Sequence, residues 1–436
     1  MIQAIQFILS LSILIVLHEL GHFIPAKLFK TKIEKFYLFF DPWFSLFKIK
    51  RGETEYGIGW LPLGGYVKIA GMIDESMDKE QMKLPPEPWE FRSKPAWQRL
   101  IIMCGGVTVN VLLGILIYAM VLFTWGDEYL ETNNAKFGIS CDSTALHIGL
   151  KNGDKVLGVD HAPVKKFNKI ALAFLFDNAK SIQVERDGQK LDIPVQEDIR
   201  PQIIHKQGFI EPRVPAYVDT VLPDKAAFKA GLLKGDSIIA VNGDSMGYFD
   251  QVRDAVRRSK NKSVELTVVR KSATVQLTVK VDSTGTIGFA VSSDPHRYFN
   301  ITERKFSFFS SFPAGLHKGI ETMVIYVKNI RVLLTVKEAH KSLGGFIAIG
   351  KMYAPVWDWK SFWSFTGFLS FVLAVMNILP IPALDGGHVM FLLYEVITRR
   401  KPNEKFLEYA QYAGMILIVA LLIYANSNDV VRLFSK

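Results

Sequence analysis

Charged residues are missing from three long stretches of this 436-residue chain. Residues 100–125, 361–384 and 409–426 contain no Asp, Glu, Lys or Arg, although such residues make up 22% of the sequence. A run of about 20 apolar residues is long enough to cross a bilayer as a helix. These absences argue against a wholly soluble protein. Together with an apolar N-terminal segment they predict four transmembrane helices, at residues 1–29, 100–125, 361–385 and 409–426.

Cysteine is scarce, because Cys104 and Cys141 are the only two. Cys104 lies inside the second apolar segment and Cys141 lies in the long segment after it, so we expect no disulfide between them. The N-terminus also lacks the basic residues that precede the apolar core of a secretory signal peptide. We therefore expect the first apolar segment to be retained.

A nucleic-acid-binding motif is absent despite an excess of positive charge. The chain has 52 Lys and Arg against 42 Asp and Glu, yet no basic and aromatic array accompanies them, so we exclude nucleic acid as a partner. The basic residues instead flank the apolar segments, at Lys27, Lys30, Lys32, Lys35, Arg92, Lys94, Arg99, Arg399, Arg400 and Lys401. The positive-inside rule makes these loops cytoplasmic, and it places both termini and residues 126–360 on the opposite side.

Two histidines and a glutamate lie in the first apolar segment. His18, Glu19 and His22 form an H-E-x-x-H motif. One ionisable side chain at the centre of a membrane helix costs roughly 2.5 to 3.5 kcal/mol on insertion scales, so three together indicate a metal ion or another compensating partner. On a helix the two histidines share one face and can bind one zinc ion, and Glu19 beside them is a candidate general base.

A third zinc ligand is expected, because catalytic zinc usually takes three protein ligands and keeps one position open. Asp385 is the candidate, in the sequence N-I-L-P-I-P-A-L-D-G-G at residues 377–387. Pro380 and Pro382 each remove an N–H group and disfavour helix, which predicts an unwound chain at this point. Such a chain is tolerated at membrane depth only beside protein or a watery cavity. The alternative for Asp385 is a helix cap at the membrane surface.

An internal repeat of Gly-Leu-x-x-Gly-Asp lies in the long segment between the second and third apolar runs. Each copy is followed by the alternating apolar residues of a strand. The repeated residues are Gly149, Leu150, Gly153 and Asp154, and then Gly231, Leu232, Gly235 and Asp236. The repeat resembles the signature of PDZ domains, which implies two PDZ-like α+β modules at residues 127–205 and 206–295. Peptide binding at a sheet edge and a spacer role with an empty groove are equally open for each copy.

Two shorter sequence patterns predict a β-hairpin and an amphipathic helix. Residues 53–60 and 65–70, joined across Pro62 and Gly64, predict a β-hairpin within segment 30–99. Residues 317–334 carry apolar side chains at helical spacing with charged ones between them. This pattern predicts an amphipathic helix on the outer membrane face, followed by a loop, within residues 310–350.

The order of these motifs resembles that of the site-2 protease family of intramembrane zinc metalloproteases. The match covers nearly the whole chain, and G-G-V-T-V-N at residues 105–110 is similar to the family's G-P-x-x-N. The chain departs from the family at Gly106-Val107, where relatives usually have Gly-Pro. It also departs at residues 39–42, F-F-D-P, where relatives often have G-F-G-P. Neither departure involves a candidate ligand.

The resemblance implies zinc on His18, His22 and Asp385, with Glu19 activating water. It also implies that the hairpin re-enters the membrane, and that the PDZ-like modules exclude substrates with bulky external domains. The candidate substrate-binding residues are Asn377, Pro380, Pro382, Asn110, Gly64 and Gly65. For the two asparagines, bridging two helices or satisfying an unwound helix is an equal alternative.

These observations together predict a multi-pass α-helical membrane protein with two inserted PDZ-like domains and a membrane-reentrant β-hairpin. The expected activity is zinc-dependent cleavage of single-span membrane proteins, such as anti-sigma factors, that a site-1 protease has already shortened. The expected location is a bacterial inner membrane, with the modules on the extracytoplasmic side. Two alternatives are a tandem-PDZ scaffold without catalysis, which the metal-binding residues argue against, and a membrane zinc protease for lipidated peptides, which the modules argue against.

Overall fold

The structure is a computed structural model that describes residues 1–72, 84–206 and 209–434. The remaining positions lie outside the described residues; they include residues 73–83 of the predicted segment 30–99 and residues 207–208 of the predicted segment 206–295. The chain forms two compact units. The first consists of Met1–Gly126, Lys305–Arg331 and His340–Lys436, and the second of Asp127–Arg304 and Val332–Ala339.

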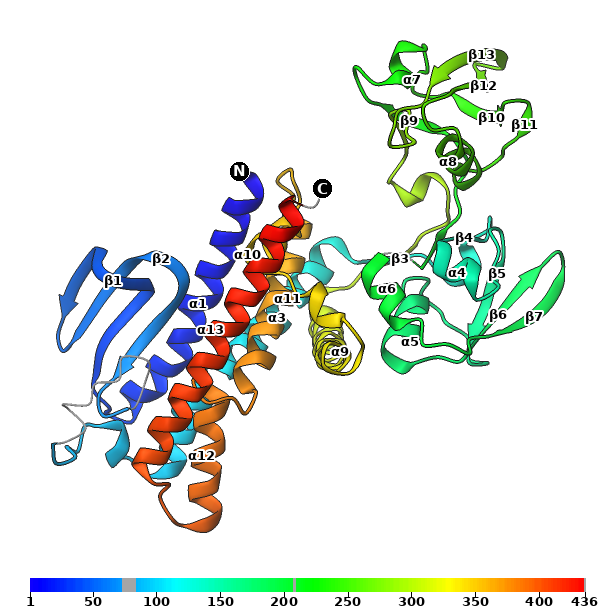
Figure 1. Cartoon of the computed structure of the whole chain (residues 1–436). Helices are drawn as coiled ribbons and strands as arrows, with labels where there is room; N and C mark the ends of the chain where they lie inside the picture. The colour runs from blue at the N-terminus through cyan, green and yellow to red at the C-terminus, as the bar shows by residue number, and fades with distance from the viewer. Residues whose placement is uncertain (73–83, 207–208, 435–436) are drawn as a thin grey trace. The chain divides into compact units, whose positions relative to one another are not determined.

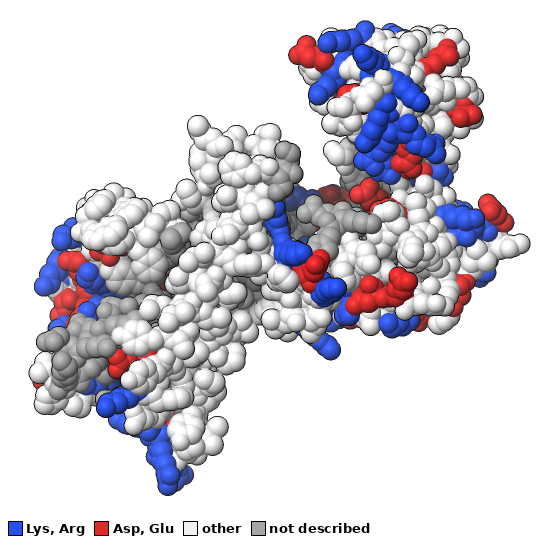
Figure 2. All heavy atoms as spheres, in the orientation of Figure 1, with Lys and Arg blue, Asp and Glu red and all other residues white. Residues whose placement is uncertain are grey.

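Four helices of the first unit are long and apolar enough to cross a membrane. They are α1 (Ile2–Leu28), α3 (Ala96–Trp125), α11 (Trp359–Ile378) and α13 (Glu404–Phe434). Helix α3 packs against both α1 and α11. Figure 2 shows few charged side chains over the helices that Figure 1 labels α1 and α13. The prediction of four apolar helices is therefore confirmed.

One face of α1 carries buried polar side chains. Gln6, Ser10, His18 and His22 are all buried, and residues four apart in a helix lie on the same face. Polar groups in membrane helices face other helices rather than lipid. The H-E-x-x-H motif consequently lies on the side of α1 that packs against the rest of the unit.

Helices α1 and α3 approach each other closely at two glycines. A Cβ atom on Gly105 would lie 1.9 Å from the carbonyl oxygen of Gly21, and a Cβ on Gly21 would lie 2.4 Å from the carbonyl oxygen of Gly105. Small residues let membrane helices pack backbone against backbone. This contact holds α3 against the turn of α1 that contains the two histidines.

The chain is unwound between α11 and the next helix, as the prolines predicted. Helix α11 ends at Ile378, and α12 (Asp385–Thr398) begins at Asp385. In the connecting segment Ala383 has φ 78°, and its N–H donates to Gln411 Oε1 at 3.1 Å. The predicted span 361–385 therefore ends before Asp385, and α12 is a helix that the sequence analysis did not anticipate.

Strands β1 (Ile33–Arg51) and β2 (Thr54–Ile69) form a sheet that packs against α1 (Figure 1). Leu38 lies opposite Gly65 and also opposite Ile58, so the two halves of β2 flank the first half of β1. The predicted pairing of residues 53–60 with 65–70 is wrong. Residues 33–40 are rich in aromatic side chains that favour strands, and they take the central place. The second half of β2 has no further strand partner among the described residues.

Helix α9 (Phe308–Thr335) contains the predicted amphipathic segment and begins before residue 317. Its glycines contact neighbouring helices, because a Cβ on Gly315 would lie 2.7 Å from the Ala119 nitrogen and one on Gly319 would lie 2.5 Å from the Phe371 ring. Two short helices follow, η4 (Ala339–Ser342) and α10 (Phe346–Lys351), and the second ends one residue beyond the predicted segment 310–350.

The second unit contains two modules that share the order strand, helix, strand, helix, two strands and a final strand; α6 is additional in the first module and β11 in the second. The first comprises β4 (Ile139–Cys141), α4 (Ser143–His147), β5 (Lys155–Val159), α5 (Lys169–Asp177), β6 (Ser181–Arg186), β7 (Gln189–Pro194), α6 (Arg200–Lys206) and β8 (Ile210–Pro212). The second comprises β9 (Val218–Val221), α7 (Ala226–Lys229), β10 (Ser237–Val241), β11 (Asp244–Ser245), α8 (Phe249–Arg258), β12 (Ser263–Arg270), β13 (Ala273–Lys280) and β14 (Phe289–Val291).

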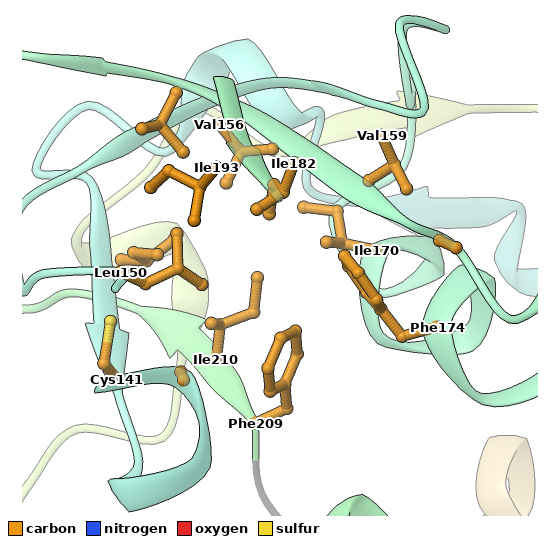
Figure 3. Close-up of a cluster of buried hydrophobic side chains, with 14 of the residues drawn as sticks. Cys141, Leu150, Val156, Val159, Ile170, Phe174, Ile182, Ile193, Phe209 and Ile210 are labelled. Carbon is orange, nitrogen blue, oxygen red and sulfur yellow. The ribbon is translucent and has the colours of Figure 1, made fainter. Parts of the chain in front are cut away.

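Equivalent strands pair in the two modules. Strand β6 joins β5 to β7, as β12 joins β10 to β13, and the first strand of each module pairs with the last. The core of the first module includes Phe209 and Ile210, whose side chains lie near Leu150 and Phe174 (Figure 3). This module therefore continues through β8, beyond residue 205, because β8 is the partner of β4. Strands β3 (Asp127–Tyr129) and β15 (Thr302–Arg304) pair outside the two modules.

The aspartate of each repeat is a structural residue. Asp236 is buried and accepts hydrogen bonds from Arg270 Nε at 2.8 Å and from the backbone N–H of Leu233 at 2.9 Å. Burial alone would raise the pKa of Asp236, but these donors hold it below its ordinary value. Asp154 in the first module has the same partners, Arg186 Nε at 2.7 Å and the N–H of Lys151 at 2.8 Å.

Candidate active site

Helices α1 and α12 bring His18, His22 and Asp385 together. Nε2 of each histidine lies 3.3 Å from Asp385 Oδ2, and the two Nε2 atoms are 3.3 Å apart. The histidines come from successive turns of α1, and the aspartate is the first residue of α12. Among the residues that the structure describes, this is the one cluster of three such side chains that could hold a metal ion.

The geometry of this triangle fits a zinc ion. Zinc binds histidine nitrogen and carboxylate oxygen at about 2.0 to 2.2 Å in tetrahedral sites, so neighbouring ligand atoms are about 3.3 to 3.5 Å apart. The three observed separations match that spacing. Asp385 Oδ2 is buried and accepts no hydrogen bond, so a metal ion would satisfy a carboxylate oxygen that is otherwise without a donor.

Gly106 on α3 leaves the space in front of the histidines open. A Cβ atom at this position would lie 2.3 Å from His22 Nε2 and 2.8 Å from His18 Nε2. Any side chain here would collide with the nitrogen atoms that face Asp385. The motif that contains Gly106 is visible in the sequence, but this role depends on the close packing of α1 and α3.

Each histidine has a partner on α3 for its other ring nitrogen. His22 Nδ1 lies 2.8 Å from the carbonyl oxygen of Ile102, and His18 Nδ1 lies 3.1 Å from the side-chain amide of Asn110. Metal-binding histidines almost always use their second nitrogen in this way, which fixes the ring and its tautomer. The sequence offered no signal for Ile102, because its contribution is a backbone carbonyl.

Glu19 lies beside the triangle and next to the sheet. A Cβ atom on Gly65 would lie 2.6 Å from Ile15 and 3.7 Å from Glu19 Cγ, so this glycine lets the sheet approach α1. The candidate base thus lies between the metal-binding cluster and the second half of β2.

The remaining candidate substrate-binding residues differ in whether they contact the candidate zinc ligands. Asn377 lies at the cluster, with Nδ2 3.2 Å from His18 Nε2. Gly64 lies against the ring of Phe40, and Pro382 packs against Gly414 of α13. Pro380 is exposed in the unwound segment. Pro380 and Pro382 therefore lie in the segment that leads into Asp385, and the structure gives neither a contact with the triangle.

These features define a class of protein. Two histidines and a neighbouring glutamate lie on α1, a helix that can cross a membrane, and an aspartate at the start of α12 completes the zinc-binding spacing. A catalytic zinc site with three protein ligands and a neighbouring general base is the arrangement of zinc metalloproteases. The class is therefore that of membrane-embedded zinc metalloproteases.

Comparison with known proteins gives the family. The model of Peptidase family M50 matches residues 6–421. Regulator of sigma-E protease RseP of Escherichia coli (strain K12) is 29% identical over 456 residues, which cover 98% of each chain. A relative from Treponema pallidum (strain Nichols) is 28% identical over 454 residues, which cover 100% of each chain. A relative from Vibrio cholerae serotype O1 is 29% identical over 458 residues, which cover 98% of each chain. The names of both include the words zinc metalloprotease. The chain belongs to peptidase family M50, and it is a zinc metalloprotease.

The space at Gly106 generates a first prediction. We expect Gly106→Ala to weaken zinc binding by roughly 10- to 100-fold, the effect typical of disturbing the groups around a metal ligand, because the new methyl group displaces the histidine rings. Zinc content after dialysis against a graded chelator measures the effect. Gly350→Ala is the control, since its nearest neighbouring atom would be 3.9 Å away. Unchanged zinc affinity in Gly106→Ala would contradict the geometry described above.

Proposed function

We propose that this protein is an intramembrane endopeptidase that cleaves the membrane-spanning segments of single-span proteins. The observation that supports this proposal best is the position of the candidate ligands. His18 and His22 lie in the second half of an apolar helix that can cross a membrane, and Asp385 follows the end of another. A substrate that reaches them must itself enter the apolar layer.

The proposed chemistry is peptide hydrolysis. His18, His22 and Asp385 would hold a zinc ion, which when bound supplies Lewis-acid activation of water and of the scissile carbonyl. Glu19 accepts the proton of the attacking water at its carboxylate and passes it to the leaving amine. The position of Glu19, which is half-buried and next to the candidate ligand His18, supports this role.

A helical substrate must be unwound before it can be cut, because its backbone carbonyls are already hydrogen-bonded. We propose that the second half of β2, at Gly65 to Ile69, receives the unwound substrate as an added strand. This edge passes beside Glu19, and Gly65 allows the close approach. Asn377 then has an amide group available for the substrate backbone at the triangle.

We further propose that the β1–β2 sheet enters the membrane from the cytoplasmic side. Its support is a set of exposed apolar side chains on β1, namely Trp43, Phe44, Leu46, Phe47 and Ile49. Clustered exposed apolar residues mark a surface that contacts lipid or a partner. The orientation of the whole chain in a bacterial inner membrane rests on the basic loops, and it would place the two modules on the extracytoplasmic side.

The two modules are proposed to be PDZ-like and to select substrates by size. Their repeated order of strands and helices supports the assignment, and the buried Asp154 and Asp236 explain the repeated signature as a requirement of folding. In this proposal a site-1 protease first removes the external domain of a substrate such as an anti-sigma factor. Membership of a peptidase family argues against a scaffold without catalysis. No contact among the described residues favours lipidated peptides over membrane-spanning ones.

The role of Glu19 gives a direct test of the proposed chemistry. Glu19→Gln should lower the cleavage rate of a truncated single-span substrate by roughly 10²- to 10⁴-fold, because an amide cannot accept the proton. Zinc content should stay at the parent level, since Glu19 is outside the triangle. Cleavage followed by gel mobility in reconstituted vesicles measures the first quantity, and metal analysis the second. Turnover near that of the parent would exclude Glu19 as the base.

Removal of both modules tests the proposed size selection. Because β3 pairs with β15, with Tyr129 opposite Thr302, residues 131–300 can be replaced by a short glycine and serine linker that preserves this pairing. Val332 and Val336 pack with side chains of the first module and should be changed to serine in the same variant and in a full-length control.

The deletion variant should cut an intact substrate with a large external domain, which the full-length control should leave uncut. Both proteins should cut the truncated substrate. If the modules instead recruit substrates by binding a newly formed chain end, the deletion will slow cleavage of the truncated substrate and leave the intact one uncut. That result would contradict selection by size.

A further inference from the structure

Asn110 on α3 is a fully buried amide beside the first histidine. Its side-chain amide lies 3.1 Å from His18 Nδ1, on the opposite side of the ring from the Nε2 atom that faces Asp385. Its backbone carbonyl accepts a hydrogen bond from Ser370 Oγ of α11 at 2.7 Å. Three helices therefore meet at this residue.

We propose that Asn110 is a positioning residue that holds the His18 imidazole in the tautomer and orientation needed for zinc binding at Nε2. This inference rests on the zinc ligation by His18 proposed above. It assigns Asn110 a role different from the substrate contact that the sequence suggested, because a side chain with no exposed surface cannot reach a substrate.

The two nitrogens of the imidazole ring have different roles in a zinc ligand. A neutral imidazole that binds a metal through Nε2 carries its proton on Nδ1, and that N–H needs an acceptor when it is buried. Among the described residues, Asn110 is the hydrogen-bond partner of His18 Nδ1. The amide of asparagine offers an acceptor oxygen, and rotation of the amide group brings either its oxygen or its nitrogen to the ring without changing its shape.

A buried oxygen atom supports the same conclusion. Asn110 Oδ1 is buried and has no hydrogen-bond partner. With Oδ1 turned toward His18, the oxygen accepts the Nδ1–H and gains the partner that it lacks. The same rotation moves Nδ2 away from His18, so its benefit is an acceptor for the Nδ1–H of the zinc-binding tautomer.

His22 provides an internal comparison. Its Nδ1 lies 2.8 Å from the Ile102 carbonyl oxygen, an acceptor that no side-chain substitution removes. Helix α3 thus offers an acceptor to each histidine. The backbone carbonyl of Ile102 serves His22, and in this proposal the side-chain amide of Asn110 serves His18. Of these two partners, Asn110 is therefore the one that a side-chain substitution can test. Asn377 has a different position from Asn110, because its amide lies on the Nε2 side of His18.

The test compares Asn110→Leu, which has similar size and no acceptor, with Asn110→Asp, which keeps an acceptor beside Nδ1. Zinc affinity of the purified full-length protein is measured by chelator competition, and the visible absorption of the cobalt-substituted protein reports ligand geometry. We expect Asn110→Leu to bind zinc roughly 10- to 100-fold more weakly and to have an altered cobalt spectrum. Asn110→Asp should bind zinc nearly as tightly as the parent.

Two further variants make the result interpretable. Gln6→Leu removes another buried amide, which donates to the Ala354 carbonyl oxygen away from the triangle, and it should leave zinc affinity unchanged. His18→Ala should abolish tight binding. If Asn110→Leu binds zinc as tightly as the parent, or if Asn110→Leu and Asn110→Asp lose zinc affinity equally, the positioning role of Asn110 is wrong. The proposed zinc ligands would not be affected by either result. Parent-like affinity of His18→Ala would overturn the proposed ligand set together with the positioning role.

Discussion

The structure depends on one constraint, which is that ionisable side chains in apolar helices must compensate one another. His18, His22 and Asp385 would each be costly alone at membrane depth, but at 3.3 Å from one another they form a site that one cation can satisfy. The break between α11 and α12 places Asp385 at the start of a helix, where it meets the two histidines of α1. The surrounding packing then has to leave room for them.

Glycine supplies that room at the contact between α1 and α3. Gly21 and Gly105 let the two backbones touch, and Gly106 leaves the space in front of the histidine nitrogens free. The same approach brings the Ile102 carbonyl and the Asn110 amide to the outer nitrogens of the two rings. Close helix packing and ligand orientation are therefore two effects of the same contact.

Part of the fold and of the candidate site was predictable from the sequence, because some patterns depend only on residues that are close together in the chain. The apolar runs, the H-E-x-x-H spacing and the two prolines each carry their own physical meaning, so the helices and the unwound segment before Asp385 were expected. The pairing of β1 with β2 was not, because residues 35–38 take partners on two sides and register depends on the whole sheet. Asn110 and Gly106 gain their roles only when α3 meets α1, which no local pattern encodes.

The most direct test of the account asks whether Asp385 binds the zinc ion. X-ray absorption at the zinc edge of the protein in bilayers should show only nitrogen and oxygen ligands, at about 2.0 to 2.2 Å. In Asp385→Cys, a zinc–sulfur distance of about 2.3 Å should appear, because the new thiolate occupies the position of the carboxylate. A parent spectrum that contains sulfur, or an Asp385→Cys spectrum identical to that of the parent, would contradict the proposed site.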